Sequence, residues 1–221
     1  MSRFAAFALS LAAGAWCVAG CASAEDANTG GARDLSALAE PEDLAAAGDL
    51  AHDGGAPAIT CGAGLHVVVN EVQVGSAASA SDEFIELYNP CAVAVDLAGS
   101  TLVYRSAAGI TDVVIISLTK PIAAGGYYLV TGPTFGDLGA PDQSYGAGHL
   151  AAAGGGVGVR DGAQLLVDSV GYGTATNAFI EGAVAPAPPN GQSIARKPNG
   201  ADSNHNEVDF VASAPTPRAA N

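Results

Sequence analysis

Oxygen-bearing side chains recur at alternate positions in one short segment near the end of the chain. They belong to Asp202, Asn204 and Asn206, with Asp209 three residues further on, so that they occupy positions 1, 3, 5 and 8 of the segment. Calcium takes about six to eight oxygen ligands, which Asp and Asn at alternate places in a tight loop can supply. The same residues also form Asx-rich turns without any metal. The segment lacks the glycine and distal glutamate of an EF-hand, so the sequence favours a metal-free turn, with no cofactor, and keeps a calcium loop as the alternative.

A second group of carboxylates comes earlier, at Glu71, Asp82, Glu83 and Glu86. If the segments that hold Glu71 and Glu86 pair as neighbouring strands, their carboxyl groups lie close together. Two close carboxylates raise one pKa or bind a cation, and such pairs perform acid–base chemistry in glycosidases. The alternating apolar residues around them favour a simpler interpretation, a polar face of a sheet.

Other signs of catalysis are missing from the sequence. It has no nucleophile elbow, and its four histidines, at positions 52, 66, 149 and 205, have no Cys or His neighbours at ligand spacing. The glycines at 154–158 lack the strand-to-helix context of a phosphate loop and are interpreted as a turn. We therefore expect no enzyme. The alternative is a metal-dependent envelope hydrolase or its accessory subunit, with calcium in the loop from Asp202 to Asp209.

The chain begins with the layout of an export signal: Arg3, an apolar run over 4–18, and small residues. The run is shorter than the roughly 20 apolar residues of a spanning helix. Its end, Val18-Ala19-Gly20-Cys21, resembles the lipobox of bacterial lipoproteins. The resemblance implies that residues 1–20 are cleaved, that Cys21 carries lipid and that this lipid holds the protein at a membrane. By the same resemblance, Ala22 in place of Asp after the cysteine implies the outer membrane of the cell envelope.

An ordinary signal peptide is the alternative to lipidation. Ala22-Ser23-Ala24 fits the small-x-small pattern, and cleavage after Ala24 leaves a secreted protein. In either case Cys61 and Cys91 remain as unmodified cysteines, because Cys21 carries lipid in the first case and is cleaved off in the second. Two thiols in an oxidising compartment predict a disulfide, provided that their Cα atoms lie within about 7 Å.

Residues 21–62 are interpreted as the lipidated N-terminus and a flexible acidic linker. Between residues 22 and 58 there are eight acidic residues against Arg33 alone, with no aromatic residue. Such a segment buries too little apolar surface to offset the entropy of ordering it. The formal net charge of −14 for the whole chain argues against binding nucleic acid through nonspecific electrostatics.

From residue 63 to 221 the pattern changes to short β-branched and aromatic runs separated by turn residues. Expected strands lie at 65–74, 83–89, 92–96, 101–105, 112–118, 127–131, 156–160, 165–172 and 192–197. Alternation in the first two runs predicts strands with one covered face. No convincing amphipathic helix follows residue 60. This spacing predicts an all-β fold, a sandwich or a barrel.

Two features of this part are candidates for partner contact. The first is a set of aromatic residues that we expect to be exposed, although each also suits a sandwich core: Tyr88, Tyr104, Tyr127, Tyr128, Tyr145, Tyr172 and Phe179. The second is the segment 173–190, rich in Ala and Pro. It is either a functional loop or a passive crossover that covers a sheet edge.

Several unlike motifs in this part follow one another in a familiar order. They are VVNEVQVG, DEFIELYNPCAVAVDLAGSTL, GGYYLVTG, LVDSVGYG, the block from PAPPNGQSIARK to NEVDF, and PTPRAAN. Together they resemble the lamin tail domain of bacterial exported proteins. The family often has Gly where Arg218 stands, and the two cysteines are an addition. The resemblance implies an immunoglobulin-like β-sandwich and a noncatalytic module that binds or scaffolds a protein or glycan partner.

Overall fold

The computed structural model describes residues 59–62, 64–136 and 138–221. The signal peptide, Cys21 and the linker up to residue 58 lie outside these residues, so those expectations stay predictions. The described part is almost entirely β, with one short helix, α1 (Asn206–Asp209). None of its helices is long and apolar enough to cross a membrane. This content of strands confirms the predicted all-β fold.

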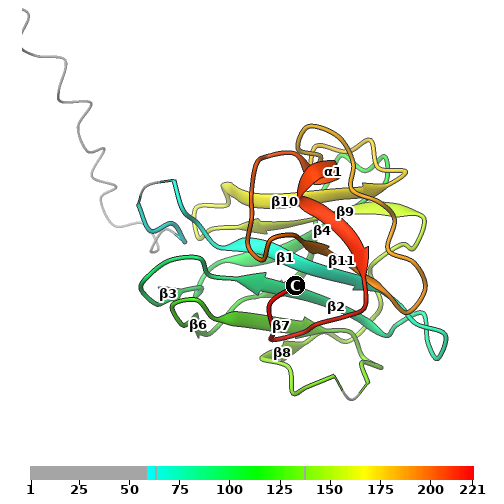
Figure 1. Cartoon of the computed structure of the whole chain (residues 1–221), viewed down its shortest axis with the longest axis horizontal. Helices are drawn as coiled ribbons and strands as arrows, with labels where there is room; N and C mark the ends of the chain where they lie inside the picture. The colour runs from blue at the N-terminus through cyan, green and yellow to red at the C-terminus, as the bar shows by residue number, and fades with distance from the viewer. Residues whose placement is uncertain (1–58, 63, 137) are drawn as a thin grey trace, which may run out of the picture. The chain divides into compact units, whose positions relative to one another are not determined.

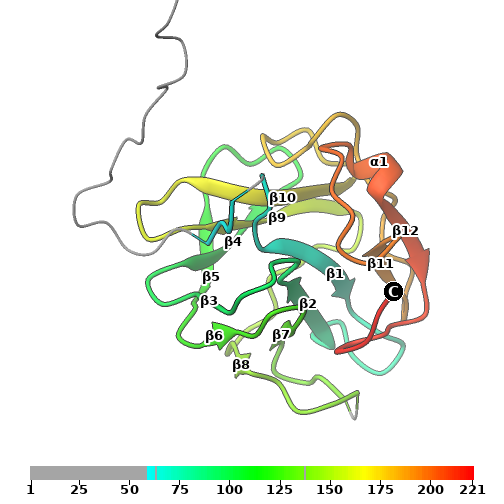
Figure 2. The same ribbon diagram turned by 60° about the vertical axis from the view of Figure 1, so that its left-hand side comes forward.

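The strands form two main layers (Figures 1 and 2). One sheet has the order β12-β11-β1-β2-β7-β8. Its strands are β1 (Val68–Val74), β2 (Glu83–Tyr88), β7 (Tyr127–Thr131), β8 (Gln143–Ser144), β11 (Ser193–Arg196) and β12 (Phe210–Ser213). The other sheet has the order β10-β9-β4-β5. It consists of β4 (Thr101–Ser106), β5 (Val113–Ser117), β9 (Gly154–Arg160) and β10 (Leu166–Gly173). A short ribbon pairs β3 (Val95–Asp96) with β6 (Pro121–Ile122).

The core of this sandwich is apolar and receives side chains from both sheets. The six-stranded sheet contributes Val72, Ile85 and Leu87, and the four-stranded sheet contributes Leu102 and Val157 among others. Ile59 is also part of this core, four residues before the expected domain boundary at 63. The folded part therefore includes residues that the sequence assigned to the linker.

The expectation of one covered face is wrong for β1 and β2. Every residue of β1 is buried, and so are five of the six in β2. A bulge lies between Val69 and Glu71, so Val69 and Val72 both face the core although their positions differ in parity. The acidic side chains on the face of this sheet that points away from the core are covered by other segments of the chain. The candidate sites lie where these segments contact the sheet.

The glycines at 154–158 belong to β9, so the expected strand at 156–160 is confirmed and the interpretation of 154–158 as a turn is wrong. Gly154, Gly156 and Gly158 lie against the segment 173–190, which packs across the outer face of the four-stranded sheet. The ring of Phe179, 1% exposed, lies there. A Cβ atom on Gly156 would come within 2.8 Å of the Cβ of Phe179, and one on Gly158 within 3.2 Å of its ring. The segment is thus a packed crossover, which explains why this strand needs glycine.

The close approach at Gly156 gives a testable consequence. We expect Gly156→Ala to lower the free energy of unfolding by about 2 kcal/mol, because a methyl group must displace Phe179. Gly136→Ala is a matched control, since a Cβ there meets nothing within 4 Å. Urea unfolding of both variants measures the difference. Equal stability of the two variants would contradict the packing described for β9.

Candidate functional site

Arg196 on β11 is the centre of the most connected polar cluster in the described part. Its side chain is fully buried. The guanidinium donates to Asp168 Oδ1 at 2.9 Å and to Asp209 Oδ2 at 3.0 Å. It also donates to Asp202 Oδ1 at 3.2 Å, and Nε donates to the Val69 carbonyl at 2.9 Å. Since a buried charge is tolerated only when paired and hydrogen-bonded, these contacts hold β11, β10 and the loop after β11 together.

The predicted calcium ligands are arranged around this arginine. Asp202 and Asp209 both turn toward Arg196. The Asn206 side chain points instead to β10 and the crossover, where Oδ1 accepts the Gly171 and Glu181 N–H groups. Asn204, at φ +56°, follows an Asx turn in which its N–H donates to Asp202 Oδ1. The four side chains do not converge on one point, and the metal-free turn accounts for them. Calcium binding by this loop stays a prediction.

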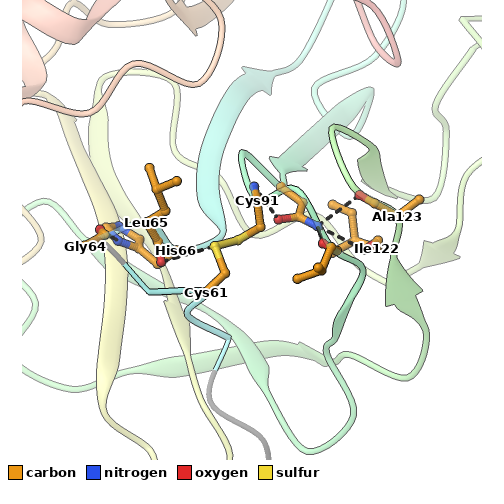
Figure 3. Close-up of a disulfide and its surroundings, with 9 residues drawn as sticks. Cys61, Gly64, Leu65, His66, Cys91, Ile122 and Ala123 are labelled. Atoms are coloured by element: carbon orange, nitrogen blue, oxygen red, sulfur yellow. Dashed lines mark hydrogen bonds between the residues drawn. A yellow bond between two sulfur atoms is a disulfide. The ribbon is translucent and has the colours of Figure 1, made fainter.

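His66 contacts this cluster through Asp202. Its Nε2 lies 3.2 Å from Asp202 Oδ2, and its Nδ1 lies 3.2 Å from the Gly64 carbonyl. The disulfide between Cys61 and Cys91, with Cα atoms 5.9 Å apart, anchors the loop that carries the histidine (Figure 3). Beside His66 and Asp202 is a small cavity of about 100 Å³, lined also by Leu65, Val68 and Pro90. The predicted disulfide is therefore confirmed, and it helps to position the histidine.

The ionisable side chains of the cluster shift one another's pKa values. The hydrogen bond from His66 lowers the pKa of Asp202 to about 2, and the same bond raises the pKa of His66. Burial, together with the charges of Asp168 and Asp202, raises the pKa of Glu181 to about 7. Four carboxylates, those of Asp168, Glu181, Asp202 and Asp209, thus surround Arg196 and His66. Negative charge is in excess at this place.

Glu71 and Glu86 are direct neighbours across β1 and β2, as the sequence suggested. The C-terminal segment covers them. Thr216 N–H donates to Glu71 Oε1 at 2.9 Å, and Arg218 N–H donates to Glu86 Oε2. Ser193 Oγ also donates to Glu71 Oε1. The pair is therefore bonded to the chain's own backbone, an arrangement that fixes the C-terminal segment. It explains why both carboxylates are fully buried.

The Glu86 carboxyl gives a prediction about pH. Burial raises its pKa from 4.5 to about 8, with the nearby Glu71 charge acting in the same direction. Between these values the folded protein holds a proton that the unfolded chain has released, so stability falls as pH rises. At about 1.4 kcal/mol for each pH unit, this group lowers the free energy of unfolding by at most about 3.5 kcal/mol between about pH 5 and pH 8.

The variant that tests this is Glu86→Gln, because an amide stays neutral and still accepts the Arg218 N–H. We expect it to remove the contribution of Glu86 to the pH slope in urea unfolding, while that of Glu181 remains, and to stabilise the protein above pH 8. Glu207→Gln, at an exposed position, is the control and should keep the slope. Equal pH slopes in the wild type and in Glu86→Gln would show that Glu86 is ionised in the folded protein.

A third buried glutamate, Glu83, organises the loop after β8. It accepts the Tyr145 hydroxyl at 2.7 Å and the N–H groups of His149 and Leu150 at 3.0 Å. An open depression of about 310 Å³ adjoins it. This carboxylate, like the Glu71 and Glu86 pair, is engaged in bonds that shape a loop.

The expectation of exposed aromatic residues is largely wrong. Five of the seven side chains are buried: Tyr104, Tyr128, Tyr145, Tyr172 and Phe179. Tyr88 and Tyr127 are half-buried and lie against each other with ring centroids 5.1 Å apart. The side chains that do face solvent are aliphatic. They are most exposed at Ile110, 89%, just before β5, and at Leu165, 66%, just before β10.

No known family model matches the chain, and no curated protein matches it either. The resemblance to the lamin tail domain, and the immunoglobulin-like arrangement that it implies, therefore stay predictions. The all-β sandwich does not depend on them, because it follows from the strand pairing. The Arg196 cluster is equally independent, since its contacts are made by the chain's own residues.

Proposed function

We propose that this chain is a lipid-anchored protein of the cell envelope, at the outer membrane, that displays a noncatalytic β-sandwich for binding a partner. Lipid on Cys21 provides the anchor, and the acidic linker provides reach. About 40 residues of flexible chain span roughly 35 Å on average, and repulsion between the acidic residues extends it. The sandwich is then the part available for contact with other envelope components.

The observation that carries the binding role is the open edge at β5. This strand ends the order of the four-stranded sheet, and its side chains are aliphatic: Val113, Val114, Ile115 and Ile116. Val113 and Val114 are 47% and 54% exposed. An exposed aliphatic edge strand is a template for pairing with an extended segment of another protein. Of the two partner classes, protein and glycan, the edge favours protein.

The noncatalytic role is supported by how the carboxylates are used. Acid–base chemistry requires groups that reach a substrate. Glu71 and Glu86 accept N–H groups of the C-terminal segment, and Asp202 and Asp209 accept hydrogen bonds from Arg196. These groups stabilise the fold, which leaves recognition as the function that the surface supports best.

Crosslinking in intact cells tests the proposal. We expect wild-type protein to capture a protein neighbour that Cys21→Ala, which lacks the anchor, does not capture. Val114→Lys should also lose this neighbour, because lysine on an edge strand opposes pairing. Val208→Lys is the control, since Val208 is 62% exposed but lies on α1. Recovery of the same neighbour with Cys21→Ala and with Val114→Lys would contradict the proposal.

A further inference from the structure

His66 and Asp202 face each other in a way that requires a positive species between them. The Gly64 carbonyl, 3.2 Å from His66 Nδ1, can only accept a hydrogen bond, so Nδ1 must carry the hydrogen. Nε2 then faces a carboxylate oxygen of Asp202 at 3.2 Å, and an ionised carboxylate is also only an acceptor. Either a second proton or a metal ion must lie at Nε2.

The surroundings fit a metal ion. Donor atoms of His66, Asp168 and Asp202 lie within 4.8 Å of one another. Zinc binds imidazole nitrogen and carboxylate oxygen at about 2.0–2.2 Å, which places two ligands of one ion about 3 to 4 Å apart. The separation of 3.2 Å between His66 Nε2 and Asp202 Oδ2 falls in this range. The bond from His66 Nδ1 to a backbone carbonyl is the contact that orients metal-binding histidines.

The carboxylates are held in place from behind. Arg196 donates to Asp202 Oδ1, which leaves Oδ2 facing His66. Asp168 accepts Arg196 at both oxygens and the Val69 N–H at Oδ2, so it would bind the ion through a lone pair that these bonds leave free. The cluster has four carboxylates around one guanidinium and one histidine, so a dication reduces its excess of negative charge. The adjoining cavity of about 100 Å³ has room for a water molecule as a further ligand.

We propose that His66, Asp202 and Asp168 form a site for a divalent transition metal, and that the ion bound there is Zn²⁺. The site is distinct from the calcium loop predicted from the sequence, with which it shares only Asp202. It goes beyond the proposed binding function, because it ties His66 to β10 and to the segment after β11. The mixed nitrogen and oxygen donors favour zinc over calcium, which takes oxygen ligands.

Calorimetric titration of the purified full chain with zinc, after removal of metals with EDTA, tests the site. We expect about one zinc ion per chain and a melting temperature that rises with zinc. His66→Gln, which keeps a hydrogen-bond donor toward Asp202, should weaken zinc binding by at least about tenfold. His205→Gln is the matched control. His205 lies in the same loop as Asp202, with its Nδ1 near the Ser203 carbonyl, and its loss should leave the affinity unchanged.

Asp202→Asn provides a second variant in case His66→Gln does not fold. It should also weaken zinc binding by at least about tenfold. Calcium is titrated in the same way. Unchanged zinc affinity in both variants, or no zinc binding by the wild type, would overturn the proposal. So would a calcium response as strong as the zinc response, because it would assign the ion to an all-oxygen site.

Discussion

Replacement of Arg196 by methionine is expected to lower the free energy of unfolding by about 4 kcal/mol. Methionine fills much of the same volume, so the main loss is electrostatic. It leaves Asp168 and Asp209 buried without their positive partner, and uncompensated buried charges of this kind cost about 3 to 5 kcal/mol. The Val69 carbonyl also loses its donor, and the Phe210 ring loses the guanidinium that lies 4.6 Å from its centre.

A matched comparison separates this effect from the general loss of an arginine. Arg218 also pairs with an aspartate, Asp142, at 2.7 Å, but its side chain is 38% exposed. Exposed ion pairs contribute about 0 to 1 kcal/mol, so Arg218→Met should destabilise by no more than about 1 kcal/mol. Urea unfolding of both variants measures the difference. Equal losses would mean that the Arg196 cluster does not hold the sandwich together.

Loss of the disulfide is expected to have the second-largest effect. The bridge between Cys61 and Cys91 closes a loop with a sequence separation of 30 residues. In the chain-entropy model this constraint on the unfolded chain contributes about 3 to 4 kcal/mol. Within the folded part, the bridge attaches the segment that carries His66 to the loop where Asn89 Oδ1 accepts the Cys91 N–H.

The double variant Cys61→Ala, Cys91→Ala tests the contribution of the bridge. We expect its free energy of unfolding to be about 3 to 4 kcal/mol below that of the oxidised wild type. Adding reductant should destabilise the wild type and leave the double variant unchanged. A loss below about 1 kcal/mol would indicate that residues 59–66 stay in place through other contacts.

Local pattern predicted the strands well. The observed bounds of β2, β4, β5 and β7 lie within one residue of the expected runs. The pairing of Glu71 with Glu86 also followed, because neighbouring strands in sequence usually lie side by side. The cysteine pair was predicted from compartment alone. These features depend on residues close in sequence or on simple chemistry.

What the sequence did not reveal depends on contacts between distant segments. Arg196 approaches Asp168 only because β11 and β10 are brought together by the fold, and no local motif marks that pair. The need for glycine at positions 156 and 158 of β9 comes from the packing of Phe179, which lies about 20 residues later. The switch of parity at Asn70 depends on a bulge against β2. A buried tyrosine such as Tyr145 needs the Glu83 carboxylate as its partner.

The buried carboxylates share one explanation. A lone carboxylate in the interior is costly, but each of these accepts bonds that fix a segment: Glu83 the loop after β8, Glu86 the C-terminal segment, and Asp168 the arginine. These carboxylates therefore stabilise the positions of loops and segments from inside the domain. The exposed aliphatic edge of β5 is the surface that the proposed recognition would use.

Mass spectrometry of the N-terminal peptide from native membranes tests the anchored display most directly. The account predicts a mature chain that begins at Cys21, with acyl chains on this residue. It also predicts that Cys21→Ala releases the protein from the membrane fraction. A mature chain that begins at Glu25, or an intact leader with an unmodified Cys21 thiol, would contradict it.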